Sequence, residues 1–365
     1  MNTKLLVISL APAAGLQHFI PRCDRRSAFF GIGAATLANV PPASALAAAT
    51  TPKIPTWRLK GGVAFPTLAL NTAGLTADGA ELAFRNAVAA GISHVDFHPG
   101  IERDGVARVL PSIARESVFL NTKIPTKWEK GTITPSEAAA SVPKFLDENL
   151  AILGTDYVDM FMLRDSTDPA VMRAMWKEME KAKADGRARS LGVINYCEGA
   201  LQIILSTANE LPSINYFQLH AGMGPDSGGL RAFGETRGIR TFAYGHLGER
   251  ANPKGDTDEL LASPTLRRIG AAHGGRTAEE IALKWVLQSG AAASVRPTSN
   301  FAKGRSACDA TSSACADGLR TSAGAFGYKL TKAEMKEIDA MTSPMGYPTL
   351  FSSPGCPDSF FSVRS

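Results

Sequence analysis

From about residue 55 onward, short apolar runs alternate with stretches whose apolar residues recur every three or four positions. The short runs are rich in β-branched and aromatic residues, which predicts strands, and the longer stretches predict amphipathic helices. The predicted strands are "FPTLAL", "ISHVDF", "SVFLNTK", "YVDMFML", "SLGVIN", "INYFQL", "IRTFAY" and "AASVRP". The clearest predicted helices are "ELAFRNAVAAG", "SEAAASVPKFLDENLAILG", "PAVMRAMWKEMEKAKADG" and "TAEEIALKWVLQSG". Eight strands alternating with helices in roughly 300 residues favour a closed (β/α)₈ (TIM) barrel over an open sheet. No G-x-G-x-x-G follows the first strand, so a Rossmann dinucleotide site is not expected.

The first 50 residues have a different pattern, with two apolar runs, each too short to span a bilayer, and very few acids. The second run follows "DRRSAFF" and ends before Ala45-Leu46-Ala47, which resembles a twin-arginine export signal with a peptidase site. Two signals in tandem predict routing to a plastid, to the thylakoid lumen, with bacterial export or an unaddressed apolar tail as alternatives. We therefore divide the chain into a targeting segment (1–50), a barrel (55–345) and a tail (346–365).

Charge and cysteine content narrow the range of partners. The formal net charge is +5, and residues 1–26 contribute +3 of it, so the remainder gives no reason to expect a nucleic-acid partner. The five cysteines show neither C-x-x-C spacing nor neighbouring histidines, so we expect no zinc site. Cys308 and Cys315 lie in a stretch rich in small residues, 300–326, that we predict as a loop. They either pair in an oxidising compartment or remain free thiols.

Several of these segments together resemble the aldo-keto reductases. "LKGGVAFPTLALNTAG" is similar to the opening hairpin and first strand of that family, and "AGISHVDF" and "YVDMFMLR" are similar to its second and fourth strands. "DGRARSLGVINY", "GIRTFAYGHLG" and "GGRTAEEIALKWVLQSGAAASVRPTS" resemble its later strands, and "YKLTKAEMKEIDAM" its terminal helix. The likeness runs from Leu59 to Met341. It implies a barrel that reduces a small-molecule carbonyl with NADPH, and we expect a monomer with no membrane segment in its mature form.

The resemblance also assigns catalytic positions, and half of them have changed. The family uses an Asp and a Tyr after the second strand, a Lys ending the third and a His ending the fourth. Asp96 and Lys123 match, but Ile101 stands at the tyrosine position and Arg164 at the histidine position. A tyrosine beside an ammonium donates the proton to the developing alkoxide, and arginine cannot replace it because it stays charged. We therefore predict carbonyl reductase activity that is weakened or lost.

The cofactor pocket implied by the resemblance is partly retained. Its predicted members are Thr72, Asn195, Tyr216, Tyr244 and Ser299. Asn195 keeps the carboxamide-binding asparagine and Tyr244 the aromatic that stacks on nicotinamide, whereas Tyr216 replaces a glutamine. Ile194 replaces the serine before Asn195, and Thr298 replaces the lysine for the 2′-phosphate. NADP is thus the expected cofactor, with its phosphate clamp altered.

Three interpretations of this site remain open on the sequence. The first is a slow NADP(H)-dependent reductase. The second is a non-catalytic barrel in which Arg164 and Lys123 bind an anionic small molecule and Asp96 forms a structural ion pair with Lys123. The third keeps the enzyme and lets His98 or His246, both predicted on loops at the catalytic face, donate the proton.

Overall fold

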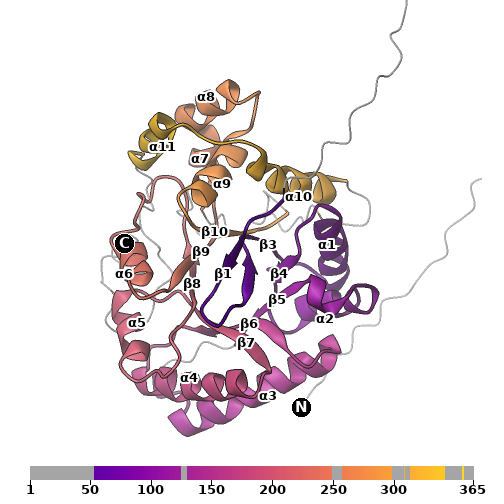
Figure 1. The fold of residues 1–365 in the computed structure, drawn as a ribbon, viewed down its shortest axis with the longest axis vertical. Helices are drawn as coiled ribbons and strands as arrows, with labels where there is room; N and C mark the ends of the chain where they lie inside the picture. Colours follow the sequence, from indigo (N-terminus) through magenta and orange to yellow (C-terminus); the bar gives the residue numbers. More distant parts are fainter. Residues whose placement is uncertain are drawn as a thin grey trace, which may run out of the picture. The chain divides into compact units, whose positions relative to one another are not determined.

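Eight parallel strands close into a barrel, which confirms the predicted (β/α)₈ architecture (Figure 1). The structure is a computed structural model that describes residues 53–124, 130–248, 257–297 and 313–341, together with Cys308 and Cys356. In barrel order the strands are β10 (Ala292–Val295), β3 (Leu68–Asn71), β4 (His94–Asp96), β5 (Phe119–Lys123), β6 (Val158–Arg164), β7 (Ala188–Ile194), β8 (Ile214–Gln218) and β9 (Arg240–Tyr244). All eight predicted strands are therefore present. They are buried along nearly their whole length, which explains why they read as continuous apolar runs.

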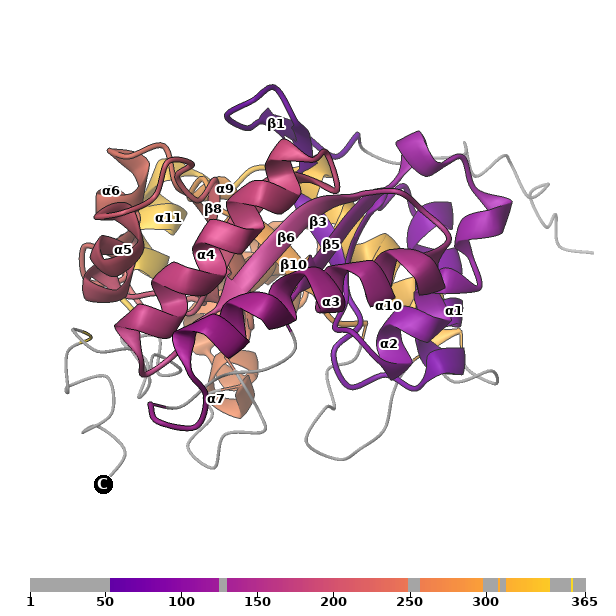
Figure 2. The ribbon, with the colours of Figure 1, turned by 90° about the horizontal axis from the view of Figure 1, so that it is seen from below.

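Helices surround the barrel on its outer side (Figures 1 and 2). They are α1 (Ala77–Ala89), α2 (Ile101–Ala107), α3 (Pro135–Leu153), α4 (Pro169–Ala184), α5 (Glu198–Leu205), α6 (Leu230–Glu235), α7 (Thr257–Ala262), α8 (Pro264–Ala272), α9 (Ala278–Gln288), α10 (Ala314–Gly324) and α11 (Lys332–Asp339). Helices α3 and α4 pack side by side across two neighbouring strands (Figure 2). Helix α3 begins with a capping box between Thr134 and Glu137 and ends at Gly154, whose φ is 65°.

Helix α10 corrects one prediction. We expected a loop across 300–326, but a helix occupies its second half. Small residues misled the interpretation, because alanine is the strongest helix former and the stretch contains a buried stripe. Cys315, Leu319 and Ala323 recur at four-residue spacing and all are buried against the core.

A short hairpin lies at the amino-terminal end of the barrel strands, where Figure 1 shows it in front of them. It consists of β1 (Thr56–Arg58) and β2 (Ala64–Pro66), paired antiparallel. Phe65 is completely buried and packs edge-on against Phe119 and Phe242. His94 lies among these rings, and its Nδ1 is 2.9 Å from the carbonyl oxygen of Pro66. The apolar floor of the barrel is thereby closed, and the opposite end carries the candidate chemistry.

The structure contains two disulfides. One joins two segments far apart in the chain, and the other joins two cysteines whose pairing the sequence did not decide. Cys308 and Cys315 are bonded to each other, and Cys197, directly before α5, is bonded to Cys356 near the end of the chain. Within the described parts of the chain, no helix is long and apolar enough to cross a membrane. The predicted targeting segment, Thr298 and Ser299 lie outside the described residues.

Candidate functional site

The carboxyl ends of the strands surround a cavity of about 160 Å³. Its lining contains five of the residues predicted for the site: Lys123, Arg164, Asn195, Tyr216 and Tyr244. Each comes from a different strand or from the residue just after it, which is how a parallel barrel gathers functional groups. The strand order thus brings together side chains that are up to 121 positions apart in the chain.

Asp96 and Lys123 form a buried ion pair at the floor of this cavity. The Lys123 Nζ lies 2.6 Å from Oδ1 of Asp96, and the two side chains are 1% and 0% exposed. Asn121 donates to the same oxygen at 3.2 Å, and Ser294 donates to Oδ2 at 3.0 Å. Burial acts to raise the pKa of Asp96, but the Lys123 charge and the hydrogen bonds outweigh it, and the pKa lies below its ordinary value. Asp96 is therefore ionised and fully partnered.

Tyr216 places a phenol beside this pair. Its hydroxyl donates to Oδ2 of Asp96 at 2.6 Å and accepts a hydrogen bond from Asn71 Nδ2 at 3.0 Å. Burial and the negative charge of Asp96 raise the pKa of Tyr216 well above its ordinary value. A hydroxyl that is committed to a carboxylate and reluctant to ionise is a poor acid, so Tyr216 does not supply the missing proton donor.

The tyrosine position of the resemblance carries no group that reaches the cavity. Ile101 is the first residue of α2, its side chain is 65% exposed, and it does not line the cavity. Gly100 precedes it with a φ of 98°, a backbone conformation that favours glycine, and the chain turns there so that Ile101 faces outward. At the histidine position, Arg164 does line the cavity, and its Nε is buried without a hydrogen-bond partner in the described part of the chain.

Asn195 and Tyr244 form the part of the lining that suits an amide-bearing aromatic ring. Asn195 has a φ of 59°, in the left-handed region that asparagine adopts more readily than most other non-glycine residues. Its Oδ1 accepts a hydrogen bond from the Tyr244 hydroxyl at 2.8 Å, which leaves its Nδ2 as a donor toward the cavity. The rings of Tyr216 and Tyr244 meet edge to face with centroids 5.0 Å apart, which fixes the wall of the cavity.

Thr72 has a different environment from the one expected of a cofactor ligand. It is completely buried, does not line the cavity, and donates from Oγ1 to Oε2 of Glu102 at 3.0 Å. Glu102, in the first turn of α2, also accepts from the backbone N–H of Gly74 at 2.8 Å and of His98 at 3.0 Å. Thr72 therefore stabilises the loop after β4 and does not form part of the cavity wall.

The two candidate histidines separate clearly. His98 lines the cavity, and its Nδ1 lies 3.0 Å from Oε2 of Glu102. His246 does not line it; its side chain is mostly buried, with Nε2 3.7 Å from Glu279. Sequence reasoning missed the roles of Glu102 and Asn71. Asn71 is the last residue of β3, at the carboxyl end where barrel strands present functional groups, so a signal for it existed.

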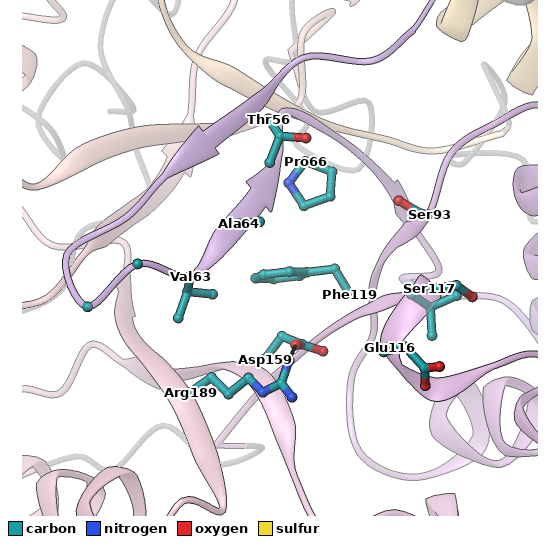
Figure 3. Close-up of a pocket in the computed structure, with 13 residues that line it drawn as sticks. Thr56, Val63, Ala64, Pro66, Ser93, Glu116, Ser117, Phe119, Asp159 and Arg189 are labelled. Atoms are coloured by element: carbon teal, nitrogen blue, oxygen red, sulfur yellow. Dashed lines mark hydrogen bonds and ion pairs between the residues drawn. The ribbon is translucent and has the colours of Figure 1, made fainter.

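A second hollow lies at the opposite end of the barrel, beside the β1–β2 hairpin (Figure 3). It measures about 420 Å³, and its lining comes from the starts of the strands, including Phe119, Asp159 and Arg189. Two of its charged side chains are paired with each other, because Asp159 accepts a hydrogen bond from Arg189 at 3.3 Å and also one from Arg115 at 2.7 Å. Although larger, this hollow offers less chemistry than the cavity at the carboxyl ends.

Comparisons with known proteins agree with this geometry. Residues 61–343 match the model of the aldo/keto reductase family. An aldo-keto reductase of Mycolicibacterium smegmatis is 28% identical over 79% of this chain and 91% of its own length. The morphine 6-dehydrogenase of Pseudomonas putida is 27% identical over 79% of this chain and 92% of its own length. The crystal structure of an aldo/keto reductase from Brucella melitensis superposes with a TM-score of 0.65 at 25% identity, covering 79% of this chain and 98% of that one.

Proposed function

This chain belongs to the aldo/keto reductase family, and we propose that its cavity binds both NADP(H) and a small carbonyl compound, which the protein reduces slowly at neutral pH. The observation that carries the proposal is the buried Asp96–Lys123 pair at the cavity. The family's tyrosine would place a hydroxyl beside the Lys123 ammonium, but Ile101 stands at that position and faces outward. In this proposal, the residues that position the cofactor and the carbonyl compound are retained, and the tyrosine that usually donates the proton is missing. General-acid catalysis contributes about 10²–10⁴-fold, so roughly that factor should be lost.

The described residues fit the nicotinamide end of the cofactor. Asn195 offers its Nδ2 to a carboxamide oxygen, and Tyr244 offers an aromatic face in the same cavity wall. When bound, NADPH supplies the hydride. Lys123 and Arg164 place positive charge where a carbonyl oxygen becomes negative, and such preorganised charge stabilises a developing oxyanion. This electrostatic contribution is what remains of the family's catalytic apparatus.

Fluorescence titration with NADPH, followed by steady-state reduction of small aldehydes at pH 7, tests the proposal. We expect saturable binding and turnover well below the ~1–10³ s⁻¹ of most enzymes. Asn195→Ala should weaken binding, and Asn209→Ala, on an exposed loop, serves as the control. A protein that does not bind NADPH, or one that turns over at ordinary rates, would contradict the proposal.

A second candidate function is a non-catalytic barrel that binds an anionic small molecule. Arg164 favours it, because a guanidinium with a buried, unpartnered Nε lines a cavity that also contains Lys123 and Arg296. Arginine forks suit carboxylates and phosphates. Calorimetry of the wild type and Arg164→Ala against NADP⁺, NAD⁺ and small organic acids separates the two functions. If acids bind tightly, NADP⁺ does not, and Arg164→Ala abolishes the binding, the second function is correct.

We further propose that the mature protein leaves the compartment of its synthesis, in a plastid for the thylakoid lumen, or by bacterial export. The twin-arginine pattern before "SAFF" motivates this proposal, and the two disulfides support it because such bonds persist in oxidising compartments. Fractionation of cells that carry a fluorescent fusion should place the protein in the lumen or outside the cytoplasm. Recovery of the full-length chain from the stroma or cytoplasm with free thiols would refute it.

A further inference from the structure

A carboxylate–imidazole pair lies at the edge of the cavity and has no counterpart among the four positions taken from the family resemblance. His98 lines the cavity with its side chain 32% exposed, and Glu102 lies behind it with its side chain 13% exposed. The Nδ1 of His98 is 3.0 Å from Oε2 of Glu102. One ring nitrogen is therefore occupied by a carboxylate, and the other remains open to a ligand.

Glu102 is held in place and charged by its surroundings. Besides His98, it accepts hydrogen bonds from Thr72 Oγ1 and from the backbone N–H of Gly74. Burial acts to raise the pKa of Glu102, but the bonds from His98 and Gly74 outweigh it, and the pKa lies below its ordinary value. An ionised carboxylate only accepts hydrogen bonds, so the hydrogen of the His98 ring must be on Nδ1. Nε2 is then the nitrogen that exchanges protons with a ligand.

We propose, on the basis of the proposed reductase function, that His98, oriented by Glu102, is the proton-transfer residue of this barrel. In reduction, a bound reduced nicotinamide would supply hydride to the carbonyl carbon, and the π electrons of the C=O bond would move onto oxygen. That oxygen takes the proton from Nε2 of the His98 imidazolium, which becomes neutral imidazole. In the reverse direction, neutral His98 accepts the hydroxyl proton of an alcohol, and a bound oxidised nicotinamide would take up the hydride from its carbon.

The charges around His98 set the pH at which it changes roles. The groups that face it are Asp96 on β4, Glu102 on α2, Lys123 on β5, Arg164 on β6 and Arg296 after β10. The charge of Lys123 and then burial lower the pKa of His98 below 6.5, while Glu102 acts to raise it. At neutral pH the ring is therefore a base. Alcohol oxidation should proceed at neutral pH, and carbonyl reduction should accelerate as the pH falls toward the lowered pKa of His98.

Nitrogen NMR of the ring in the full-length, cofactor-free protein tests the pair without activity. We expect wild-type His98 to be the Nδ1–H tautomer and to titrate below 6.5, with Glu102→Gln lowering its pKa further because the stabilising charge is lost. Comparison with His98→Gln assigns the signal. An Nε2–H tautomer, or a pKa that Glu102→Gln leaves unchanged, would overturn the proposal.

Kinetics in both directions provide the second readout. In the wild type, kcat/KM for reduction should fall and kcat/KM for oxidation should rise with pH through the same apparent pKa. His98→Gln should lose about 10²–10⁴-fold in both directions, with NADPH affinity retained. His273→Gln is the matched control, since His273 also pairs with a glutamate, Glu334, at 3.0 Å but does not line the cavity.

These outcomes separate the two proposals. If NADPH binds but His98→Gln keeps its kcat/KM, or if the wild type with bound cofactor turns over in neither direction, the assignment of His98 is wrong while cofactor binding stands. If NADPH does not bind, the proposed function fails, and the tautomer and pKa of His98 still decide whether the pair exists.

Discussion

Replacing Lys123 with methionine should destabilise the barrel severely and in a pH-dependent way. The ammonium lies 2.6 Å from a carboxylate of Asp96 that is 0% exposed. At that separation the attraction is about 6 kcal/mol for an effective dielectric constant of about 20. Most of it offsets the cost of removing two charges from water. Removal of one partner leaves the other charge buried alone, and we expect Lys123→Met to lose about 3–5 kcal/mol of unfolding free energy.

The pH dependence identifies the stranded charge as the cause. In the wild type, the pKa of Asp96 lies below its ordinary value, so its contribution to stability is present above that value and lost as the pH falls. Without Lys123, burial dominates and the pKa of Asp96 rises, so the folded variant binds a proton more readily than the unfolded chain. Its stability then decreases as the pH rises, and its deficit against the wild type should be wider at pH 8 than at pH 4.

Urea unfolding followed by tryptophan fluorescence at these two pH values measures the effect. The double variant Asp96→Asn/Lys123→Met should recover most of the loss, because no charge remains unpaired. Lys284→Met is the matched control: Lys284 is also buried but donates to the carbonyl oxygen of Ala325, so no carboxylate is stranded. A Lys123→Met deficit below about 1 kcal/mol, or one that is equal at both pH values, would refute the reasoning.

Three further predictions follow from single features of the barrel. Burial lowers the pKa of His94 from 6.5 to about 4, so the native state should lose about 3 kcal/mol as the pH falls across that interval, and His94→Gln should flatten this slope in urea titrations. Gly105→Ala should cost about 1–3 kcal/mol of unfolding free energy, because a Cβ there would clash with the backbone carbonyl oxygen of Ala77 and come within 2.8 Å of Ala80 Cβ. Scanning calorimetry of both glycine variants measures this cost: Gly324→Ala, where a Cβ meets nothing within 4 Å, should be neutral or slightly stabilising. Tyr244→Ala should weaken NADPH binding by about 1 kcal/mol, roughly five-fold in Kd by fluorescence titration, and an unchanged Kd would remove the ring from the site.

The barrel was predictable because most strands contain a short run of apolar, β-branched or aromatic residues, and nearly all strand residues are buried. The predicted run "YVDMFML" corresponds to β6 within one residue at each end. The stretch that resembles the family's opening hairpin contains β2 and the turn before it, whereas β1 lies just ahead of that stretch. Helix α10 lies in the stretch that we predicted as a loop, and the four-residue spacing of its buried Cys315, Leu319 and Ala323 was hidden by surrounding serine and glycine residues.

The sequence indicated individual residues of the site but few of the contacts between them. Asp96 and Lys123 each end an apolar strand, so their approach follows from strand order in the barrel. The hydroxyl contact between Tyr216 and Asp96 joins residues 120 positions apart, and no local pattern indicates it. The pairing of His98 with Glu102 depends on the turn at Gly100, which sends Ile101 outward. The backbone at such a turn sets the direction of the side chains, so an alignment that is wrong by one residue assigns a side chain to the wrong side.

The proposed function joins NADP(H) and carbonyl binding in this cavity to the absence of a tyrosine at position 101. A single-turnover experiment tests it most directly: the protein is saturated with NADPH at pH 7, mixed with a small aldehyde, and the loss of reduced-nicotinamide absorbance is followed. We expect a stoichiometric cofactor complex whose oxidation is slow, about 10²–10⁴-fold below that of a family member with a complete set of catalytic residues. Oxidation at the rate of that complete enzyme, or failure to form the NADPH complex, would contradict it.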